Sequence, residues 1–254
     1  MRALLDVVFP PRCAGCDRPG DLLCCACREA LSLIDQSDAC RRCGAPHGQP
    51  ICSECGLRDF AFEQARCASL LAYPVSRAIV VLKDGGERRY AALLAEMLAQ
   101  AAEGWLGPED LLVPVPASPQ AVRRRGFDHA VHLARALGAM TGNPVQRVLL
   151  ATPSADQRTL GRMDRFTNRA GAFAAARTIS GAQVVLVDDV FTTGATLDAA
   201  ARTLRAAGAA RVRALAVARA CREMSRPGVY GGPAAVDAEW TTAPAEGSVV
   251  SMVR

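Results

Sequence analysis

The stretch that decides the fold of this chain reads Val184-Val185-Leu186-Val187-Asp188-Asp189-Val190-Phe191-Thr192-Thr193-Gly194-Ala195-Thr196. Its four leading apolar residues predict a buried strand that ends at Val187. Two acids, a turn with threonines and a glycine, and a helical segment from Ala195 follow. A strand, a polar turn and a helix in this order are typical of α/β proteins with a parallel sheet.

The polar groups of this stretch gather where a ligand would bind. Ligands of open parallel sheets lie beyond the carboxyl ends of the strands, and the start of a helix attracts phosphate through its unpaired N–H groups and dipole. Hydroxyl donors come from Thr192, Thr193 and Thr196, and Gly194 lets the backbone approach a phosphate. The adjacent carboxylates suit vicinal sugar hydroxyls, directly or through Mg²⁺. The stretch therefore predicts a binding site for a sugar phosphate.

The chain after Cys67 supports this fold class, because apolar runs with the character of strands alternate with helical stretches. The expected strands are Cys67–Tyr73, Leu111–Val115, Val145–Leu149, Val184–Val187 and Val212–Val217. The expected helices are Val75–Leu82, Tyr90–Ala102, Pro119–Met140, Thr159–Ala170 and Ala195–Ala207. We predict an α/β fold with a mostly parallel sheet flanked by helices.

Cysteines dominate the segment before the sheet. Ten of the 11 cysteines precede residue 68, and eight form four C-x-x-C pairs: Cys13 and Cys16, Cys24 and Cys27, Cys40 and Cys43, Cys52 and Cys55. Two thiolates from one tight turn can reach a single tetrahedral ion, so two turns complete a four-thiolate site. The pattern predicts a small zinc-ribbon head with two structural zinc ions and no open position for a catalytic water.

Some features of this head stay open at this point. The simplest arrangement lets neighbouring pairs share an ion, although crossed pairing is an alternative. Disulfides, redox chemistry or an iron–sulfur cluster are the competing uses of the cysteines. Gly44 and Gly56, which directly follow two of the pairs, favour turns with positive φ. Cys67 and Cys221 lack close cysteine partners and are expected to be small core residues.

Bulk properties exclude some classes of protein. The formal net charge is +5, but eight thiolates with two Zn²⁺ would lower it to roughly +1, so charge alone does not indicate nucleic-acid binding. No apolar run is long enough to cross a bilayer. The run at the start is interrupted by Asp6 and ended by Pro10-Pro11, well short of a secretory signal. We expect a cytoplasmic protein.

Asp188-Asp189, followed by Thr192-Thr193-Gly194-Ala195-Thr196, resembles the motif with which type I phosphoribosyltransferases bind phosphoribosyl pyrophosphate (PRPP). Together with the four cysteine pairs, the motif makes the chain similar to the ComF family, whose members also resemble the GntX proteins. Such proteins carry a double zinc ribbon ahead of a phosphoribosyltransferase domain. The resemblance extends from about Pro11 to Ala220.

The resemblance implies a domain organisation and a ligand. Residues 1–60 would form the double zinc ribbon and residues 61–222 the phosphoribosyltransferase-like domain. Residues 223–254 are rich in Gly, Pro, Ala and Thr without periodicity, and we expect a disordered tail there. PRPP with Mg²⁺ would be held by Val187, Asp188, Asp189, Thr192, Thr193, Gly194, Ala195 and Thr196. Within this set, the two acids would hold the ribose hydroxyls and the loop after them the 5′-phosphate.

Further segments fit the same family. Val113-Pro114-Val115-Pro116 resembles the strand and loop that face pyrophosphate. The segment Arg123-Arg124-Arg125-Gly126-Phe127-Asp128-His129-Ala130 resembles the family's R-G-F-N-Q-A, with an acid and a histidine in place of Asn and Gln. The spacing of the family's hood segment is matched by Gln157, Leu160, Arg165, Asn168, Ala172 and Phe173. Lys83, the only lysine of the chain, lies in the family's L-K stretch.

Basic side chains suggest how the pyrophosphate group of PRPP would be bound. Four arginines recur at helical spacing on one face: Arg158, Arg162, Arg165 and Arg169. They suit a lid over an anion or, alternatively, a solvated helix face. The run at residues 123–125 could instead hold nucleic-acid phosphates. Our candidates for pyrophosphate contacts are Lys83, Arg125 and Arg165, while His129 and His132 are expected on a helix surface.

Three functions are compatible with these residues. The first is an amidophosphoribosyltransferase-type transfer of a 5-phosphoribosyl group to an unidentified nitrogen acceptor, with release of pyrophosphate. The second is a PRPP-binding adaptor without turnover. The third, which the resemblance implies, is a factor that handles single-stranded DNA during DNA uptake, natural transformation and competence. Aromatic residues make up only 5% of the chain, which argues against an extended stacking platform for bases.

Overall fold

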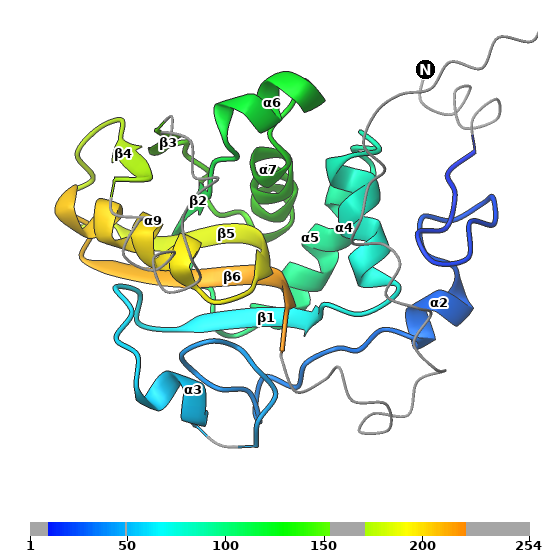
Figure 1. Cartoon of the computed structure of the whole chain (residues 1–254), viewed down its shortest axis with the longest axis horizontal. Helices are drawn as coiled ribbons and strands as arrows, with labels where there is room; N and C mark the ends of the chain where they lie inside the picture. The colour runs from blue at the N-terminus through cyan, green and yellow to red at the C-terminus, as the bar shows by residue number, and fades with distance from the viewer. Residues whose placement is uncertain (1–9, 49, 153–170, 222–254) are drawn as a thin grey trace, which may run out of the picture. The chain divides into compact units, whose positions relative to one another are not determined.

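The computed structural model describes residues 10–48, 50–152 and 171–221. Its central sheet contains β1 (Ala65–Leu70), β2 (Leu111–Pro114), β5 (Gln183–Phe191) and β6 (Arg211–Arg219). The strands lie in the order β1-β6-β5-β2, and every neighbouring pair is parallel (Figure 1). The predicted α/β fold with a parallel sheet is confirmed.

One expected strand is wrong. Val145 makes only an isolated parallel bridge to Leu112, and the strand of this region is the later β3 (Leu149–Ala151). It pairs antiparallel with β4 (Phe173–Ala175) in a separate two-stranded sheet. The physical reason lies in the polar Gln146 and the exposed Arg147, which follow Val145 and do not suit a strand buried beside β2.

The helices follow the expected pattern with one break. They are α4 (Val75–Lys83), α5 (Tyr90–Ala101), α6 (Pro119–Arg125), α7 (His129–Thr141) and α9 (Ala195–Ala206), with short α2 (Cys25–Glu29) and α3 (Ser53–Gly56) in the cysteine head. The single helix expected over Pro119–Met140 is divided, because Gly126 adopts a left-handed φ of 75° and ends α6. Asp128 then caps α7 by accepting a hydrogen bond of 3.1 Å from the backbone N–H of Ala130. The helix expected over Thr159–Ala170 lies outside the described residues.

The two faces of the sheet are covered by different helices. Residues of α4, α5 and α7 form one buried cluster with Val185 and Val187 of β5 and Leu215 and Val217 of β6. The buried residues of α9 do not belong to that cluster, although α9 contacts both strands, so it covers the opposite face. The connection that leaves β2 runs through α6 and α7, and the one that leaves β5 runs through α9. Neighbouring strands whose connections leave on opposite faces create a crevice at their carboxyl ends.

The cysteine head and the α/β body belong to one compact unit, which extends to Cys221. Backbone hydrogen bonds join them, such as the one of 3.0 Å from Ile34 N–H to the carbonyl of Ala68 in β1. Among the described residues, no helix combines the length and apolar character that a membrane span requires.

Candidate functional site

Strand β5 extends further than its apolar run predicts. The two acids were expected beyond the end of the strand, but β5 continues through Phe191, and Asp188 still aligns with Ala216 of β6. Burial alternates along this end, with Asp188 and Val190 half-buried and Asp189 and Phe191 buried. The alternation follows from the two-residue period of a strand, and it gives the two neighbouring acids different surroundings.

Asp189 is buried between two basic side chains. Its Oδ2 forms an ion pair with Lys83 at the end of α4 and lies 3.6 Å from Nε2 of His129 at the start of α7. Burial by itself would raise the pKa of Asp189, but His129 and the charge of Lys83 outweigh it and lower the pKa. Asp189 therefore stays ionised and joins the sheet to α4 and α7.

Asp188 has the opposite electrostatic character. Its Oδ1 accepts a hydrogen bond of 2.9 Å from the backbone N–H of Asp189. Burial and the adjacent carboxylate of Asp189 raise the pKa of Asp188 well above its usual value. This half-buried acid is the member of the pair that a ligand or a cation can reach without first displacing Lys83.

The structure corrects the expectation for His129. This residue was predicted on a helix surface, but it is buried and faces Asp189, because it occupies the first position of α7 and the start of that helix packs against β5. His132, one turn later, is half-buried beside the ring of Phe127. The substitution of a histidine for the amide of the R-G-F-N-Q-A segment was the available signal that His129 matters.

Arg125 lies close to this group but has its own partner. Its Nε donates a hydrogen bond of 3.1 Å to Oδ1 of Asp84, the residue after Lys83. The contact joins the end of α6 to the end of α4, so the structure brings Arg125 and Lys83 into one neighbourhood. Arg124 is exposed at the same helix end. Arg165 and the rest of the arginine stripe lie outside the described residues.

The loop from Thr192 to Gly194, called the phosphate loop below, joins β5 to α9. Gly194 has a left-handed φ of 81° and occupies the N-cap position of α9. A Cβ at this residue would lie 2.8 Å from the ring of Phe191 and 3.0 Å from that of Phe60, so only glycine fits without displacing them. Thr192 and Thr193 are exposed. Hydroxyl groups at the start of a helix beyond a parallel strand are well placed for a phosphate.

Two arginines that the sequence analysis did not single out donate hydrogen bonds to backbone carbonyls of this loop. Arg219, the last residue of β6, is buried and donates from Nη1 to the carbonyl of Thr192 at 2.8 Å. Arg58, three residues after Cys55 of the second cluster, donates from Nη1 to the carbonyl of Thr193 at 3.0 Å. In the sequence, an arginine shortly after the apolar run Val212–Val217 was the feature that could have indicated a role for Arg219.

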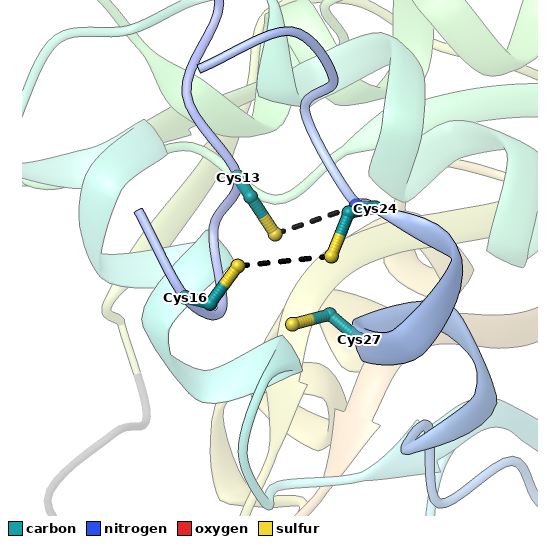
Figure 2. A group of neighbouring side chains, drawn as sticks. All are labelled: Cys13, Cys16, Cys24 and Cys27. Carbon is teal, nitrogen blue, oxygen red and sulfur yellow. Dashed lines mark hydrogen bonds between the residues drawn. The ribbon is translucent and has the colours of Figure 1, made fainter. Parts of the chain in front are cut away.

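The eight paired cysteines form two clusters, each made of neighbouring pairs. The ligand atoms within each cluster lie within 4.8 Å of one another: Cys13, Cys16, Cys24 and Cys27 in the first, and Cys40, Cys43, Cys52 and Cys55 in the second. Figure 2 shows the four sulfurs of the first cluster close together. The sulfurs of Cys16 and Cys24 are 3.7 Å apart. The simple pairing is therefore the one that the fold adopts, and crossed pairing is not.

The two clusters have the same local construction. In each, the third cysteine donates its backbone N–H to the sulfur of the first at 3.3 Å, from Cys24 to Cys13 and from Cys52 to Cys40. The residue after the first C-x-x-C has a positive φ in both cases, 64° at Asp17 and 66° at Gly44. The expectation of positive φ at Gly56 is wrong, because this residue continues the short helix α3. The second cluster is buried throughout, whereas Cys16 of the first is exposed.

The chemistry of each cluster fits a structural zinc ion. Burial raises the pKa of Cys13, but N–H donors led by Cys24 outweigh it and lower the pKa to about 6. Hydrogen bonding with Cys43 lowers the pKa of Cys40 to about 4 against the effect of burial. Burial raises the pKa of Cys27 and Cys55 to about 12, so four thiolates coexist only when a cation compensates their charge. These two sets of four sulfurs would hold two zinc ions in closed tetrahedral sites.

The fold and the two clusters define a phosphoribosyltransferase-type domain preceded by a double zinc ribbon. Residues 120–245 match the phosphoribosyl transferase domain, and residues 4–56 match the double zinc ribbon domain. The chain shares this combination of two parts with the ComF/YhgH family. The resemblance found in the sequence is thereby confirmed.

Two relatives illustrate the family. The chain is 29% identical over 200 residues to the DNA utilization protein YhgH of Salmonella typhi, covering 75% of this chain and 87% of the relative. It is 26% identical over 201 residues to the competence protein ComFC of Bacillus subtilis (strain 168), covering 76% and 82%. The solved structure of the allosteric regulatory enzyme of purine biosynthesis overlaps 50% of this chain and 25% of its own length, with 25% identity and a TM-score of 0.36. An overlap this loose carries no argument about activity.

We expect the purified protein to contain two zinc ions per chain, measurable by mass spectrometry of the metals. Cys16→Ser and Cys43→Ser should each lose one ion, because each removes a ligand from a different cluster. A structural zinc site supplies roughly 10–16 kcal/mol of apparent binding free energy, so the affected ribbon should unfold locally. Cys25→Ser is the matched control, since this exposed cysteine belongs to neither cluster. Iron, or no metal at all, in the wild-type protein would contradict the assignment.

The two acids should differ in their effect on stability. In the absence of ligand and Mg²⁺, Asp189→Asn should lower the free energy of unfolding at pH 7 by about 1–3 kcal/mol, because it leaves the half-buried Lys83 and the buried His129 without their carboxylate. Asp188→Asn should raise it, because burial and Asp189 disfavour the ionised form of Asp188 in the folded protein.

The pH dependence follows from the direction of each pKa shift. The lowered pKa of Asp189 gives stability that is present above about pH 4 and is lost as the pH falls. The raised pKa of Asp188 gives stability below about pH 4 that is lost as the pH rises. Thermal unfolding of the wild-type protein and both variants from about pH 2 to pH 8 measures the difference. Equal shifts of the melting temperature at pH 7 would show that the two acids have the same surroundings.

Proposed function

We propose that this chain binds PRPP together with Mg²⁺ at the carboxyl end of β5, and that it transfers the 5-phosphoribosyl group to a nitrogen acceptor. The observation that carries the proposal is one juxtaposition. A half-buried acid, a buried acid and a loop with exposed threonines follow one another where β5 meets α9. This order of acids and loop along the chain matches the order of the ribose hydroxyls and the 5′-phosphate along a phosphoribosyl group.

The residues divide the ligand between them in this proposal. Asp188 and Asp189 face the ribose hydroxyls, and the segment Thr192 to Thr196 holds the 5′-phosphate with hydroxyl and backbone N–H donors. Lys83, Arg125 and Arg165 meet the pyrophosphate. Pro114 at the end of β2 pairs with Val187, which supports the assignment of the loop after β2 to the pyrophosphate side. Mg²⁺, when bound, would neutralise charge on the diphosphate and the sugar oxygens.

The proposed reaction is a displacement at the anomeric carbon. The lone pair of the nitrogen acceptor forms the new C–N bond while the C–O bond to pyrophosphate breaks, and pyrophosphate leaves with the electron pair. The transition state combines a cationic sugar with a departing polyanion. Lys83 and the arginines stabilise the developing negative charge, and the acids and the loop hold the sugar in line. The acceptor nitrogen releases a proton to water as the bond forms.

We also propose the domain limits that the family implies, with the double zinc ribbon in residues 1–60 and the transferase domain in residues 61–222. The eight cysteines of the two clusters hold the zinc ions, which have a structural role. A PRPP-binding adaptor without turnover would use the same loop and acids.

The handling of single-stranded DNA is a second candidate function. It is favoured by the relatives, which are named a DNA utilization protein and a competence protein. The exposed Arg123 and Arg124 at the end of α6 are suited to contact phosphates of nucleic acid. Both activities can coexist in one chain, because PRPP would occupy the crevice and DNA a surface.

Asp188→Asn and Asp189→Asn should each weaken PRPP binding by roughly one to two orders of magnitude. A hydrogen bond to a charged partner contributes about 1.5–3 kcal/mol, and about 1.4 kcal/mol corresponds to a factor of ten. Calorimetry with PRPP and Mg²⁺ measures the effect, and Glu96→Gln, an exposed acid on α5, is the control. If the wild-type protein does not bind PRPP at millimolar concentration, the proposed function is wrong. A screen of nitrogen acceptors for pyrophosphate release then distinguishes an enzyme from an adaptor.

Arg165→Ala should separate the two candidate functions. If Arg165 meets pyrophosphate, the change should weaken PRPP binding about tenfold, with zinc content and thermal stability unchanged. If it contacts DNA instead, PRPP binding should stay the same and the salt dependence of DNA binding should decrease by about one phosphate contact. Calorimetry and DNA-binding titrations at several salt concentrations measure both. No change in either assay would make Arg165 part of a solvated face.

A further inference from the structure

A buried guanidinium connects the second cysteine cluster to the phosphate loop. Arg219 pairs with Phe191 in the sheet register, and its guanidinium lies 4.8 Å from the centre of the Phe191 ring. Nη1 donates to the carbonyls of Phe191 at 3.3 Å, of Thr192 at 2.8 Å and of Ala220. A buried cation without acceptors is costly, so these carbonyls and Arg219 hold one another in place.

The same guanidinium reaches the cysteine head. Burial lowers the pKa of Arg219, but the nearby thiolate of Cys43 in the second cluster outweighs burial and raises the pKa. The backbone of Cys43 is fixed in turn, because the Cys67 thiol of β1 donates to its carbonyl at 3.7 Å. Four thiolates around one Zn²⁺ carry a net negative charge, and that charge favours a cation beside Cys43. Arg219 thus lies between a metal cluster and the backbone of the phosphate loop.

The chain that leaves the second cluster contacts the other side of the loop. Arg58 donates to the carbonyl of Thr193, and its own carbonyl accepts a hydrogen bond from Arg42, which also donates to the carbonyl of Cys55 at 3.2 Å. Three residues later, Ala61 N–H donates to Oδ1 of Asp198 in the first turn of α9 at 2.7 Å. The segment that follows the second cluster therefore contacts both the loop and the start of α9.

An aromatic group completes this support. The ring of Phe60 lies edge-on to Phe191, with centroids 6.4 Å apart, and stacks on Phe62 at 4.7 Å. The same two rings, Phe60 and Phe191, leave no space for a Cβ at Gly194. They fix the left-handed turn from which α9 begins.

The first cluster provides an internal comparison. In the described chain, its neighbourhood is tied to the helices: Arg77 of α4 donates to the carbonyl of Gly15, and Tyr90 of α5 donates to the carbonyl of Arg12. Its cysteines Cys13 and Cys27 also pack in the core cluster of those helices. Two clusters of the same construction thus contact different parts of the transferase domain.

We propose that Arg219, together with Arg58 from the chain that leaves the second cysteine cluster, is a positioning residue that holds the phosphate loop in its ligand-binding shape. This inference rests on the proposed function in one respect, that the loop receives the 5′-phosphate. It gives the second cluster a role in ligand binding, which is to support the loop. It gives the first cluster no role at the loop. Loss of the second metal ion should consequently loosen the loop even when the rest of the domain stays folded.

The direct test compares Arg219→Met and Arg219→Lys with Arg135→Met, which removes an exposed arginine from α7. In the ligand-free protein, amide hydrogen exchange of residues 192–196 should become roughly tenfold faster in Arg219→Met, since opening the loop no longer breaks the bonds to the guanidinium. Arg219→Lys should restore part of the protection, because a cation remains. Residues 65–70 of β1 and both zinc ions should be unaffected. Unchanged exchange of the loop would overturn the proposal.

Ligand binding supplies a second readout. Calorimetry with ribose 5-phosphate should show at least a roughly tenfold loss of affinity in Arg219→Met, whereas the affinity for inorganic pyrophosphate with Mg²⁺ should change less than about twofold. Equal losses for both probes would indicate general damage and overturn the positioning role. If wild-type protein binds neither probe nor PRPP, the proposed function fails, and the exchange measurement still decides whether Arg219 holds the loop.

The duplicated head permits a matched comparison of the clusters. Cys43→Ser and Cys16→Ser remove the equivalent cysteine of each cluster and should each release one ion. Faster exchange of residues 192–196 in Cys43→Ser alone supports the proposal. The same acceleration in both variants, or in neither, contradicts it. If Cys43→Ser does not fold, the Arg219 variants decide, because they keep both clusters intact.

Discussion

Asp189 lies inside a parallel sheet, where an ionised carboxylate is costly unless basic groups compensate it. Lys83 from α4 and His129 from α7 supply that compensation. The requirement fixes where α4 ends and where α7 begins relative to β5. It also explains the break between α6 and α7, because the turn at Gly126 and the cap at Asp128 place His129 at the start of a new helix. The arrangement of one face of the sheet thus depends on one buried charge.

The neighbouring acid shows how one strand can carry two different carboxylates. A strand alternates its surroundings at every residue, so Asp188 and Asp189 do not share an environment even though they share a sequence motif. The pKa of one is raised and that of the other is lowered. Asp189 is engaged with the protein and Asp188 is accessible. In the proposed function, the accessible acid would respond to a divalent cation more strongly, because a cation relieves the repulsion between the two.

The cysteine head resembles a separate module in sequence, yet it is part of the support of the α/β domain. Its duplicated clusters reach different elements, the first the helices α4 and α5 and the second the loop after β5. A head of this size has little apolar core of its own, and metal sites compensate for that in small domains. Zinc binding and the shape of the phosphate loop are therefore coupled through Arg219 and Arg58 in our interpretation.

The sequence by itself determined the parallel α/β fold, the cysteine head with its four C-x-x-C pairs, and the order of strand, acid pair, loop and helix. Each of these depends on residues close together in the chain, such as the run from Val184 to Thr196 or one C-x-x-C turn, and local patterns report such features directly. The tertiary structure alone decided that β5 continues through both acids, that His129 is buried, and that Arg219 holds the loop. These facts depend on groups far apart in the sequence, such as Lys83 with Asp189 or Thr192 with Arg219. Periodicity describes which side of one element is apolar, but only packing decides which charged group another element places opposite it.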